Sequence, residues 1–166
     1  MGDSTIGTKR HIQAVIEIGV VLLDKLIIRL HNHDRSKLAE PELSILNENV
    51  APPSGYTTGG LKTPNDKLSE FKAHHYSINR HHPEHHENGI DGMTLIDLLE
   101  MFVDWQASVM RSQDGNIYNS IQYNVKRFNI SPQLTRILMN TALEFDDLVA
   151  HMREEYSEDP AKGSKT

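Results

Sequence analysis

The chain has 166 residues, ten histidines, no cysteine and a formal net charge of −6 with the histidines neutral. That length suffices for one domain with its own core, and the absence of cysteine excludes disulfide bonds and Cys-type zinc sites. The negative charge argues against a long nucleic acid as partner, although a small phosphate ester can still bind beside a metal ion or local basic residues.

The ends of the chain and its longest apolar stretch bear on location and domain boundaries. Residues 12–30 are interrupted by charged side chains and follow nothing that resembles a cleavable signal, so we expect no membrane partner. A cytoplasmic location is expected because the chain has no cysteine. Residues 1–7 are small and polar and residues 157–166 are charged, which predicts disordered ends around one helical domain over residues 8–156.

The first half of the chain contains three expected helices. Apolar residues recur at spacings of three and four between Thr8 and Leu30, which predicts a long helix packed on a core. A short helix is expected over residues 33–38, and Pro41 begins another that reaches about residue 49. Residues 51–60 are rich in proline and glycine and predict a loop.

The second half continues with longer helices. Thr63 and Pro64 predict the cap and first position of a helix that reaches Ile78, and the polar residues 79–92 predict a loop. Three more helices are expected over residues 93–111, 116–128 and 131–156. No strand-like alternation occurs over any length, so the sequence predicts an all-α fold, a single-domain bundle of about six helices.

His33 and Asp34, followed by Lys37, form the most informative short motif. Adjacent imidazole and carboxylate ligands suit a hydrolytic divalent metal, but neighbouring helical side chains diverge by roughly 100°. We therefore expect an ion at a helix end or between several helices, with Lys37 one turn away and able to reach a phosphate on the metal. The alternative for the isolated dipeptide is a solvated surface turn.

Six histidines gather between residues 74 and 86. His75 takes an apolar position on the face that carries Phe71 and Ile78, and His82 follows it by two helical turns. Structural roles explain one or two of these histidines, but several polar groups near a core without a ligand would be costly. We expect at least one of the six to bind a metal or a phosphate.

Further candidate ligands lie on the helices expected over residues 8–30 and 93–111. His11 shares a face with Val15 and should point toward the core, either as a ligand or as a core histidine bonded to a backbone carbonyl. Asp97 and Asp104 share one face of their helix. Asp97 can remain in solvent near the helix start, whereas Asp104, in mid-helix, needs a cationic partner if it is buried.

The ordered set His11, His33-Asp34 and Asp104 resembles the pattern of the HD-domain metal-dependent phosphohydrolases, which are all-helical enzymes. The segments over residues 33–43, 74–83 and 100–105 resemble a group of small, mostly uncharacterised bacterial and phage proteins related to HD domains. The resemblance covers roughly residues 9–107.

The resemblance implies roles for individual residues. The primary metal ligands would be His11, His33, Asp34 and Asp104. His75 and His82 would be candidates for a second metal or for the substrate phosphate, and Asn79 and Glu42 also match the motifs, Glu42 without an assigned role. The substrate-binding residues would be Lys37, Arg80, His75, His82 and Asn79, and the catalytic residues would be Lys37, Asp97 and His81. Mixed nitrogen and oxygen ligation suits one or two ions of manganese, iron, cobalt or zinc, with magnesium as an alternative.

By analogy with small HD enzymes, we expect a 5'-nucleotidase that releases phosphate from deoxynucleoside or nucleoside monophosphates. A nucleoside triphosphate triphosphohydrolase is the nearest enzymatic alternative. Two alternatives are not enzymes. One is a protein that binds a metal or a nucleotide without catalysis, and the other is a helical interaction module whose histidines are structural. The same analogy makes a homodimer an expected partner arrangement.

Overall fold

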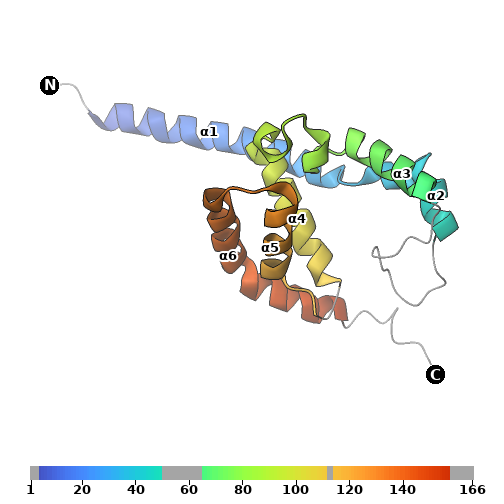
Figure 1. Ribbon diagram of the computed structural model, residues 1–166. Coiled ribbons are helices and arrows are strands. Elements are labelled where there is room, and N and C mark those ends of the chain that lie inside the picture. Colours follow the sequence, from blue (N-terminus) through green and yellow to red (C-terminus); the bar gives the residue numbers. More distant parts are fainter. Residues whose placement is uncertain (1–3, 50–64, 112–113, 158–166) are drawn as a thin grey trace. The chain divides into compact units, whose positions relative to one another are not determined.

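The computed structural model describes residues 4–49, 65–111 and 114–157. These residues form helices and turns without any strand, which confirms the all-α prediction (Figure 1). The α-helices are α1 (Ser4–His31), α2 (Glu42–Asn49), α3 (Asn65–Ile78), α4 (Leu95–Met110), α5 (Ile117–Phe128) and α6 (Pro132–Ser157). Three 3-10 turns accompany them: η1 (Arg35–Leu38), η2 (Pro83–His85) and η3 (Gly89–Gly92). The expected loop over residues 51–60 and the Thr63-Pro64 cap lie outside the described residues.

The chain divides into two compact units, Met1–Glu100 and Met101–Thr166, with the boundary inside α4. In the second unit α5 packs against α6, and each helix begins at a polar cap. The Asn116 side chain accepts a hydrogen bond from the Asn119 amide at 3.0 Å, and Ser131 Oγ accepts one from the Leu134 amide at 3.2 Å. The buried apolar residues of this unit are Met101, Phe102, Trp105, Ile117, Ile121, Ile130, Leu138 and Ala142.

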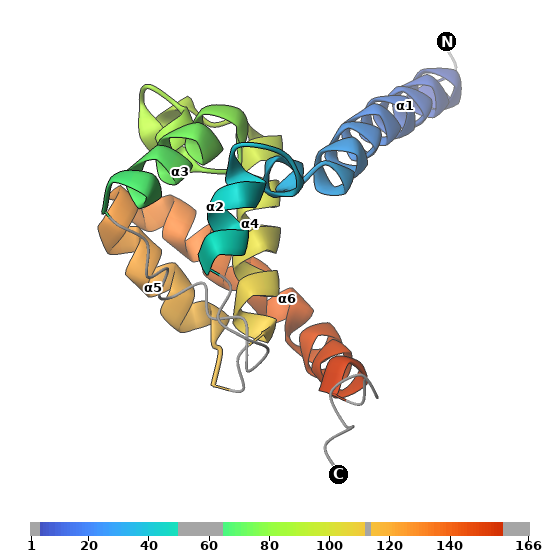
Figure 2. The ribbon, with the colours of Figure 1, turned by 90° about the vertical axis from the view of Figure 1, so that its right-hand side faces the viewer.

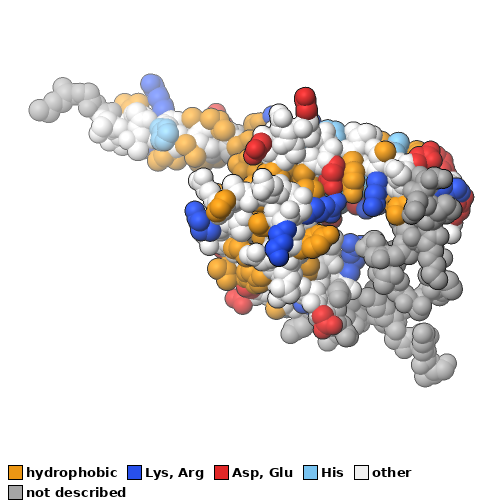
Figure 3. Space-filling view, viewed as in Figure 1, with side chains coloured by type: hydrophobic (Ala, Val, Ile, Leu, Met, Phe, Trp, Pro, Cys, Tyr) orange, Lys and Arg blue, Asp and Glu red, His pale blue; other side chains and the backbone are white. Residues whose placement is uncertain are grey.

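Helix α1 differs from the sequence expectation at its start and in its packing. It already begins at Ser4, so the prediction of a disordered segment over residues 1–7 is wrong for residues 4–7, which are helical. Figure 2 shows α1 as one uninterrupted helix, and none of its residues is buried. Apolar side chains line it (Figure 3), and those of Val15, Ile18 and Leu23 are each more than half exposed. At the other end of the chain, α6 reaches Ser157, and residues 158–166 lie outside the described part.

The interior of the first unit is mainly polar. Helix α2 packs against α3 and η1, and α3 packs against η2. Ile45 of α2 and Phe71 of α3 are buried and apolar, but several other buried side chains of this unit are charged or polar. These are Glu42, His75, Asn79, His81, Asp97 and Glu100. Buried polar groups are stable only when they are hydrogen-bonded, ion-paired or bound to a metal, so this interior is where a site is expected.

None of the described helices combines the length and the low polarity needed to cross a membrane.

Candidate metal centre

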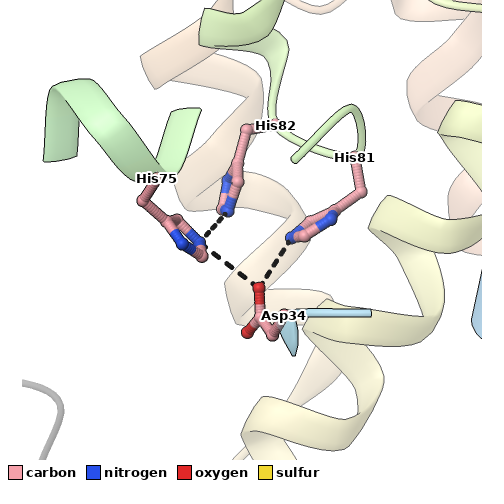
Figure 4. Close-up of side chains that lie close together, drawn as sticks. All are labelled: Asp34, His75, His81 and His82. Carbon is pink, nitrogen blue, oxygen red and sulfur yellow. Dashed lines mark hydrogen bonds and ion pairs between the residues drawn. The ribbon is translucent and has the colours of Figure 1, made fainter. Parts of the chain in front are cut away.

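Four side chains of the first unit bring one donor atom each to a common point. The donor atoms of Asp34, His75, His81 and His82 all lie within 4.8 Å of one another. In Figure 4 the three imidazoles converge on one another and on the Asp34 carboxylate. Asp34 comes from the turn between α1 and η1, His75 from α3, and His81 and His82 from the loop that follows α3. The folding of the chain, rather than proximity in the sequence, therefore brings these four residues together.

Local backbone structure explains how the turn residues reach the site. Asp34 has a left-handed conformation with φ 55° and ψ 17°, which aspartate tolerates better than most residues, and it lies in the turn that joins α1 to η1. Helix α3 ends at Ile78, and the following turn carries His81 and His82 back toward the end of the helix. The Asn79 side chain donates to the His75 carbonyl at 2.9 Å and so holds this helix end.

The distances within the cluster suit a shared cation. Asp34 Oδ1 lies 3.3 Å from His75 Nε2 and 3.6 Å from His81 Nε2, and His75 Nε2 lies 2.9 Å from His82 Nε2. Ligand atoms held about 2.1 Å from one ion lie about 3.0–3.4 Å apart in octahedral or tetrahedral geometry. The observed separations are therefore close to those of atoms that coordinate one ion.

Two of these donor atoms lack a hydrogen-bond partner. Among the described residues, Asp34 Oδ1 and His81 Nε2 are buried and accept or donate no hydrogen bond. The His81 side chain is only 1% exposed. A buried polar atom without a partner costs about 1–3 kcal/mol, so a ligand between these atoms would remove an unfavourable term. This observation favours a metal over a purely structural role for the cluster.

Lys37 and the neighbouring histidines keep Asp34 ionised. Lys37 Nζ lies 2.5 Å from Asp34 Oδ2, and His33 Nε2 lies 3.6 Å from the same oxygen. Burial alone would raise the pKa of Asp34, but His75 and Lys37 outweigh it and hold this pKa well below its usual range. Asp34 thus offers a charged oxygen to a cation at neutral pH. Lys37 neutralises the ligand Asp34, whereas the sequence led us to expect its ammonium on a substrate phosphate.

Glu42 is completely buried and contacts two adjacent histidines of α3. Its Oε1 lies 2.8 Å from His74 Nδ1, and its Oε2 lies 2.9 Å from His75 Nδ1. Ser36 Oγ donates to the same Oε2 at 3.0 Å. All three contacts come from groups that can donate, which is what a buried carboxylate requires.

Glu100 has the same relation to a second pair of histidines. Its Oε1 lies 3.1 Å from His33 Nδ1 and 3.3 Å from His81 Nδ1, and its Oε2 pairs with Arg29. Burial raises the pKa of Glu100, but His33, His81 and Arg29 lower it more, to about 2. The ionised carboxylate therefore lies on the side of the His81 ring opposite Nε2.

Asp97 anchors two arginines beside this network. It is 0% exposed, and Arg29 donates to Oδ1 at 2.8 Å while Arg80 binds both oxygens at 3.2 and 3.1 Å. The Thr94 amide and hydroxyl also donate to Oδ2, at 2.8 and 2.7 Å, at the start of α4. Burial raises the pKa of Asp97, but Arg80, Thr94 and Arg29 hold it well below the usual range. These contacts occupy both oxygens, so the structure favours an anchoring role over the catalytic role expected from the sequence.

A cavity of about 550 Å³ borders the metal cluster within the first unit. Ser36, His74, Asn79 and Glu100 line it, so it touches the residues behind the imidazoles, while the four donor residues do not line it. Arg29, Arg35 and Arg80 also line this cavity. Arg35 is exposed and hydrogen-bonds to the Asn32 side chain at 3.2 Å, with no carboxylate partner among the described residues.

The structure places the remaining predicted ligands differently. His11 is exposed on α1, twenty residues before His31, which is roughly 30 Å along a continuous helix. The prediction that His11 points into a core is therefore wrong. Within one chain, His11 does not reach Asp34. His33 lies beside the cluster, outside its four donors. Asp104 belongs to the second unit, one turn after Glu100 on α4, and its role as a ligand stays a prediction.

Sequence reasoning did not assign roles to Glu42, Glu100 and Arg29. Glu100 had one available signal, because it lies four residues before Asp104 on an otherwise apolar helix. Glu42 had only its match to the motifs of the HD-like group, because an acidic residue in the first helical turn is ordinarily explained by the helix dipole. Its importance follows only from the packing of α2 against α3.

The fold and the cluster together define an all-helical protein with a histidine-rich candidate metal centre. A family model matches residues 3–144, and the chain therefore belongs to DUF5662, a family of unknown function. No curated protein matches the chain, and no solved structure matches it.

Proposed function

We propose that this protein is a metal-dependent phosphohydrolase that acts on small nucleotides, with its metal held by Asp34, His75, His81 and His82. The observation that carries the metal site is the convergence of these four donors, two of which include a buried atom without a hydrogen-bond partner. Three imidazoles and one carboxylate suit manganese, iron, cobalt or zinc better than magnesium, which prefers an all-oxygen shell. The roles of His33 and Asp104 as primary ligands stay predictions from the sequence.

The hydrolytic part of the proposal rests on the sequence resemblance to HD-domain enzymes and on the chemistry of this donor set. A bound divalent cation would lower the pKa of water toward neutrality and polarise a phosphoryl oxygen. Asp34 would supply the negative charge that holds the cation. The Lys37 ammonium, which pairs with the other oxygen of this carboxylate, would partly neutralise that charge. His75, His81 and His82 would complete the coordination from the opposite side.

The cavity beside the cluster is the proposed place for the rest of the substrate. Its volume of about 550 Å³ is within the usual range for small-molecule sites. Arg35 can bind an anionic group there, because no carboxylate of the described residues pairs with it. Arg80 and Asn79, predicted from the sequence to bind substrate, also line the cavity. A nucleoside monophosphate that loses inorganic phosphate remains the proposed substrate, with a triphosphate as the alternative.

Elemental analysis followed by a nucleotide panel tests the proposal. The wild-type protein should bind about one equivalent of a transition metal and release phosphate from a monophosphate, whereas Asp34→Ala should lose both. Asp91→Ala is the matched control because Asp91 is an exposed aspartate of η3. Unchanged metal content in Asp34→Ala would refute the ligand assignment. Metal-loaded wild-type protein that hydrolyses no nucleotide would refute the enzymatic function and favour a silent metal- or nucleotide-binding protein.

A further inference from the structure

Two buried glutamates stand behind two of the proposed ligands in the same way. Glu42 contacts His75 at Nδ1 and Glu100 contacts His81 at Nδ1, at 2.9 and 3.3 Å. In both rings the other nitrogen, Nε2, faces Asp34 Oδ1, at 3.3 and 3.6 Å. The two glutamates come from different helices, α2 and α4, so helical periodicity does not produce this repeated arrangement.

The protonation state of each ring follows from this geometry. An ionised carboxylate can only accept hydrogen bonds, and each ring lies between two of them, with Asp34 on the Nε2 side. In both rings the contact at Nδ1 is the shorter one, 2.9 against 3.3 Å for His75 and 3.3 against 3.6 Å for His81, which favours the proton on Nδ1. A neutral imidazole that carries its proton on Nδ1 has a lone pair on Nε2, and that lone pair is what a metal binds. For His75 a further competing contact is that to Asn79 Nδ2 at 3.0 Å, because an amide nitrogen donates and would favour the opposite tautomer.

Glu42 prevails over Asn79 at His75 for a physical reason. The Glu42 carboxylate is 0% exposed, and its shorter contacts come from His74, His75 and Ser36, all of which can donate. Asn79 satisfies its amide elsewhere, by donating to Ser36 Oγ at 2.8 Å and to the His75 carbonyl at 2.9 Å. Charge-assisted hydrogen bonds are also stronger than neutral ones.

We infer that Glu42 and Glu100 are positioning residues of the metal centre, which hold His75 and His81 with Nδ1 protonated and Nε2 directed at the ion. This inference rests on the proposed metal site and adds residues that do not touch the metal. Carboxylates in this position orient metal-binding histidines and increase their basicity, and their loss typically weakens metal binding 10–100-fold.

The first test measures cobalt affinity and needs no substrate. Glu42→Gln should bind Co²⁺ about 10–100-fold more weakly than the wild type, as followed by the visible absorption of the bound ion. Glu40→Gln is the matched control, because Glu40 is exposed, lies two residues earlier and accepts from Ser44 at 2.7 Å. Its affinity should equal that of the wild type. A Glu42→Gln affinity within the error of the wild-type value would overturn the inference.

The second test begins with the wild type, so its first result does not depend on the folding of Glu42→Gln. Long-range nitrogen–proton NMR spectra of metal-free wild-type protein at neutral pH should show His75 and His81 with the proton on Nδ1. In Glu42→Gln, His75 should lose this preference while His81 keeps it, a change that a purely structural effect would not confine to one ring. Protonation of both rings on Nε2 in the wild type would overturn the inference.

The outcomes separate this inference from the proposed function. Wild-type protein that binds Co²⁺ but hydrolyses no nucleotide refutes the phosphohydrolase and leaves the positioning role intact. Tight Co²⁺ binding that is unchanged in Glu42→Gln refutes only the positioning role. Wild-type protein that takes up no transition metal overturns both.

Discussion

Carboxylates of the first unit are each shared between several positive or hydrogen-donating groups. Asp97 binds Arg29 and Arg80, and Glu100 binds Arg29 and two imidazoles. Such sharing lowers the pKa of both acids, to about 2 for Glu100. It also means that loss of one carboxylate leaves more than one partner unsatisfied, so we expect large effects from single substitutions here.

Acid should destabilise the protein through these groups. The folded-state pKa values of Asp97 and Glu100 lie below those of the unfolded chain, so their stabilising contribution is complete above about pH 5 and is lost as the pH falls toward 2. The urea midpoint of metal-free protein should therefore decrease over this interval. At pH 7, Asp97→Asn should cost about 2–3 kcal/mol, and it should reduce the pH dependence.

Asp91→Asn provides the control for this measurement because Asp91 is exposed in η3, six residues before Asp97. It should leave both the midpoint and its pH dependence unchanged. An Asp97→Asn protein as stable as the wild type at pH 7 would show that the arginine contacts do not contribute to folding.

At the scale of the elements, the proposed site is assembled from helix ends. Asp34 follows α1, His81 and His82 follow α3, and Glu42 begins α2. Helix ends carry unsatisfied backbone groups and change the chain direction, so they bring side chains from distant parts of the sequence together. His75 also lies in the last turn of α3, whereas Glu100 comes from within α4.

The capped start of α5, in the second unit, allows a calibration of helix stability. The Asn116 side chain caps α5 by accepting from the Asn119 amide. Asn116→Ala should therefore destabilise the protein by about 1 kcal/mol in urea unfolding, whereas Asn116→Asp, which retains the acceptor, should have little effect. Equal stability of the alanine variant and the wild type would contradict the assignment of the cap. Metal affinity should be unaltered in both variants.

Most elements could be predicted from the sequence because their signals are local. The first long helix was expected from Thr8 to Leu30 and spans Ser4–His31, and the last was expected over residues 131–156 and spans Pro132–Ser157. Apolar spacing, prolines and caps act within a few residues, so they determine where a helix begins and ends. The same signals did not determine burial, as exposed His11 on α1 shows.

On the scale of the whole molecule, metal binding and folding should be coupled. An ion that binds only the folded chain, at a concentration 100 times its Kd, adds about 2.7 kcal/mol of stability. For a chain of this size that increase corresponds to a Tm higher by about 5–10 °C, which calorimetry with and without Mn²⁺ or Co²⁺ can measure. Chelation should reverse the increase, and Asp34→Ala should not show it. An equal increase in Asp34→Ala would place the ion elsewhere.

The homodimer stays a prediction at this scale. Helix α1 exposes apolar side chains over most of its length, which is unusual for a helix that has no partner. Its C-terminal end nevertheless belongs to the proposed site, because Arg29 reaches Asp97 and Glu100.

The sequence by itself determined the all-helical class, the approximate helix bounds and the identity of Asp34, His75, His81 and His82 as chemically important residues. Only the tertiary structure decided that these four converge, that His11 does not join them, and that Glu42 and Glu100 lie behind the imidazoles. The reason is that helix signals depend on neighbours a few residues apart, whereas ligand geometry depends on distances between atoms that chain turns and helix packing bring together.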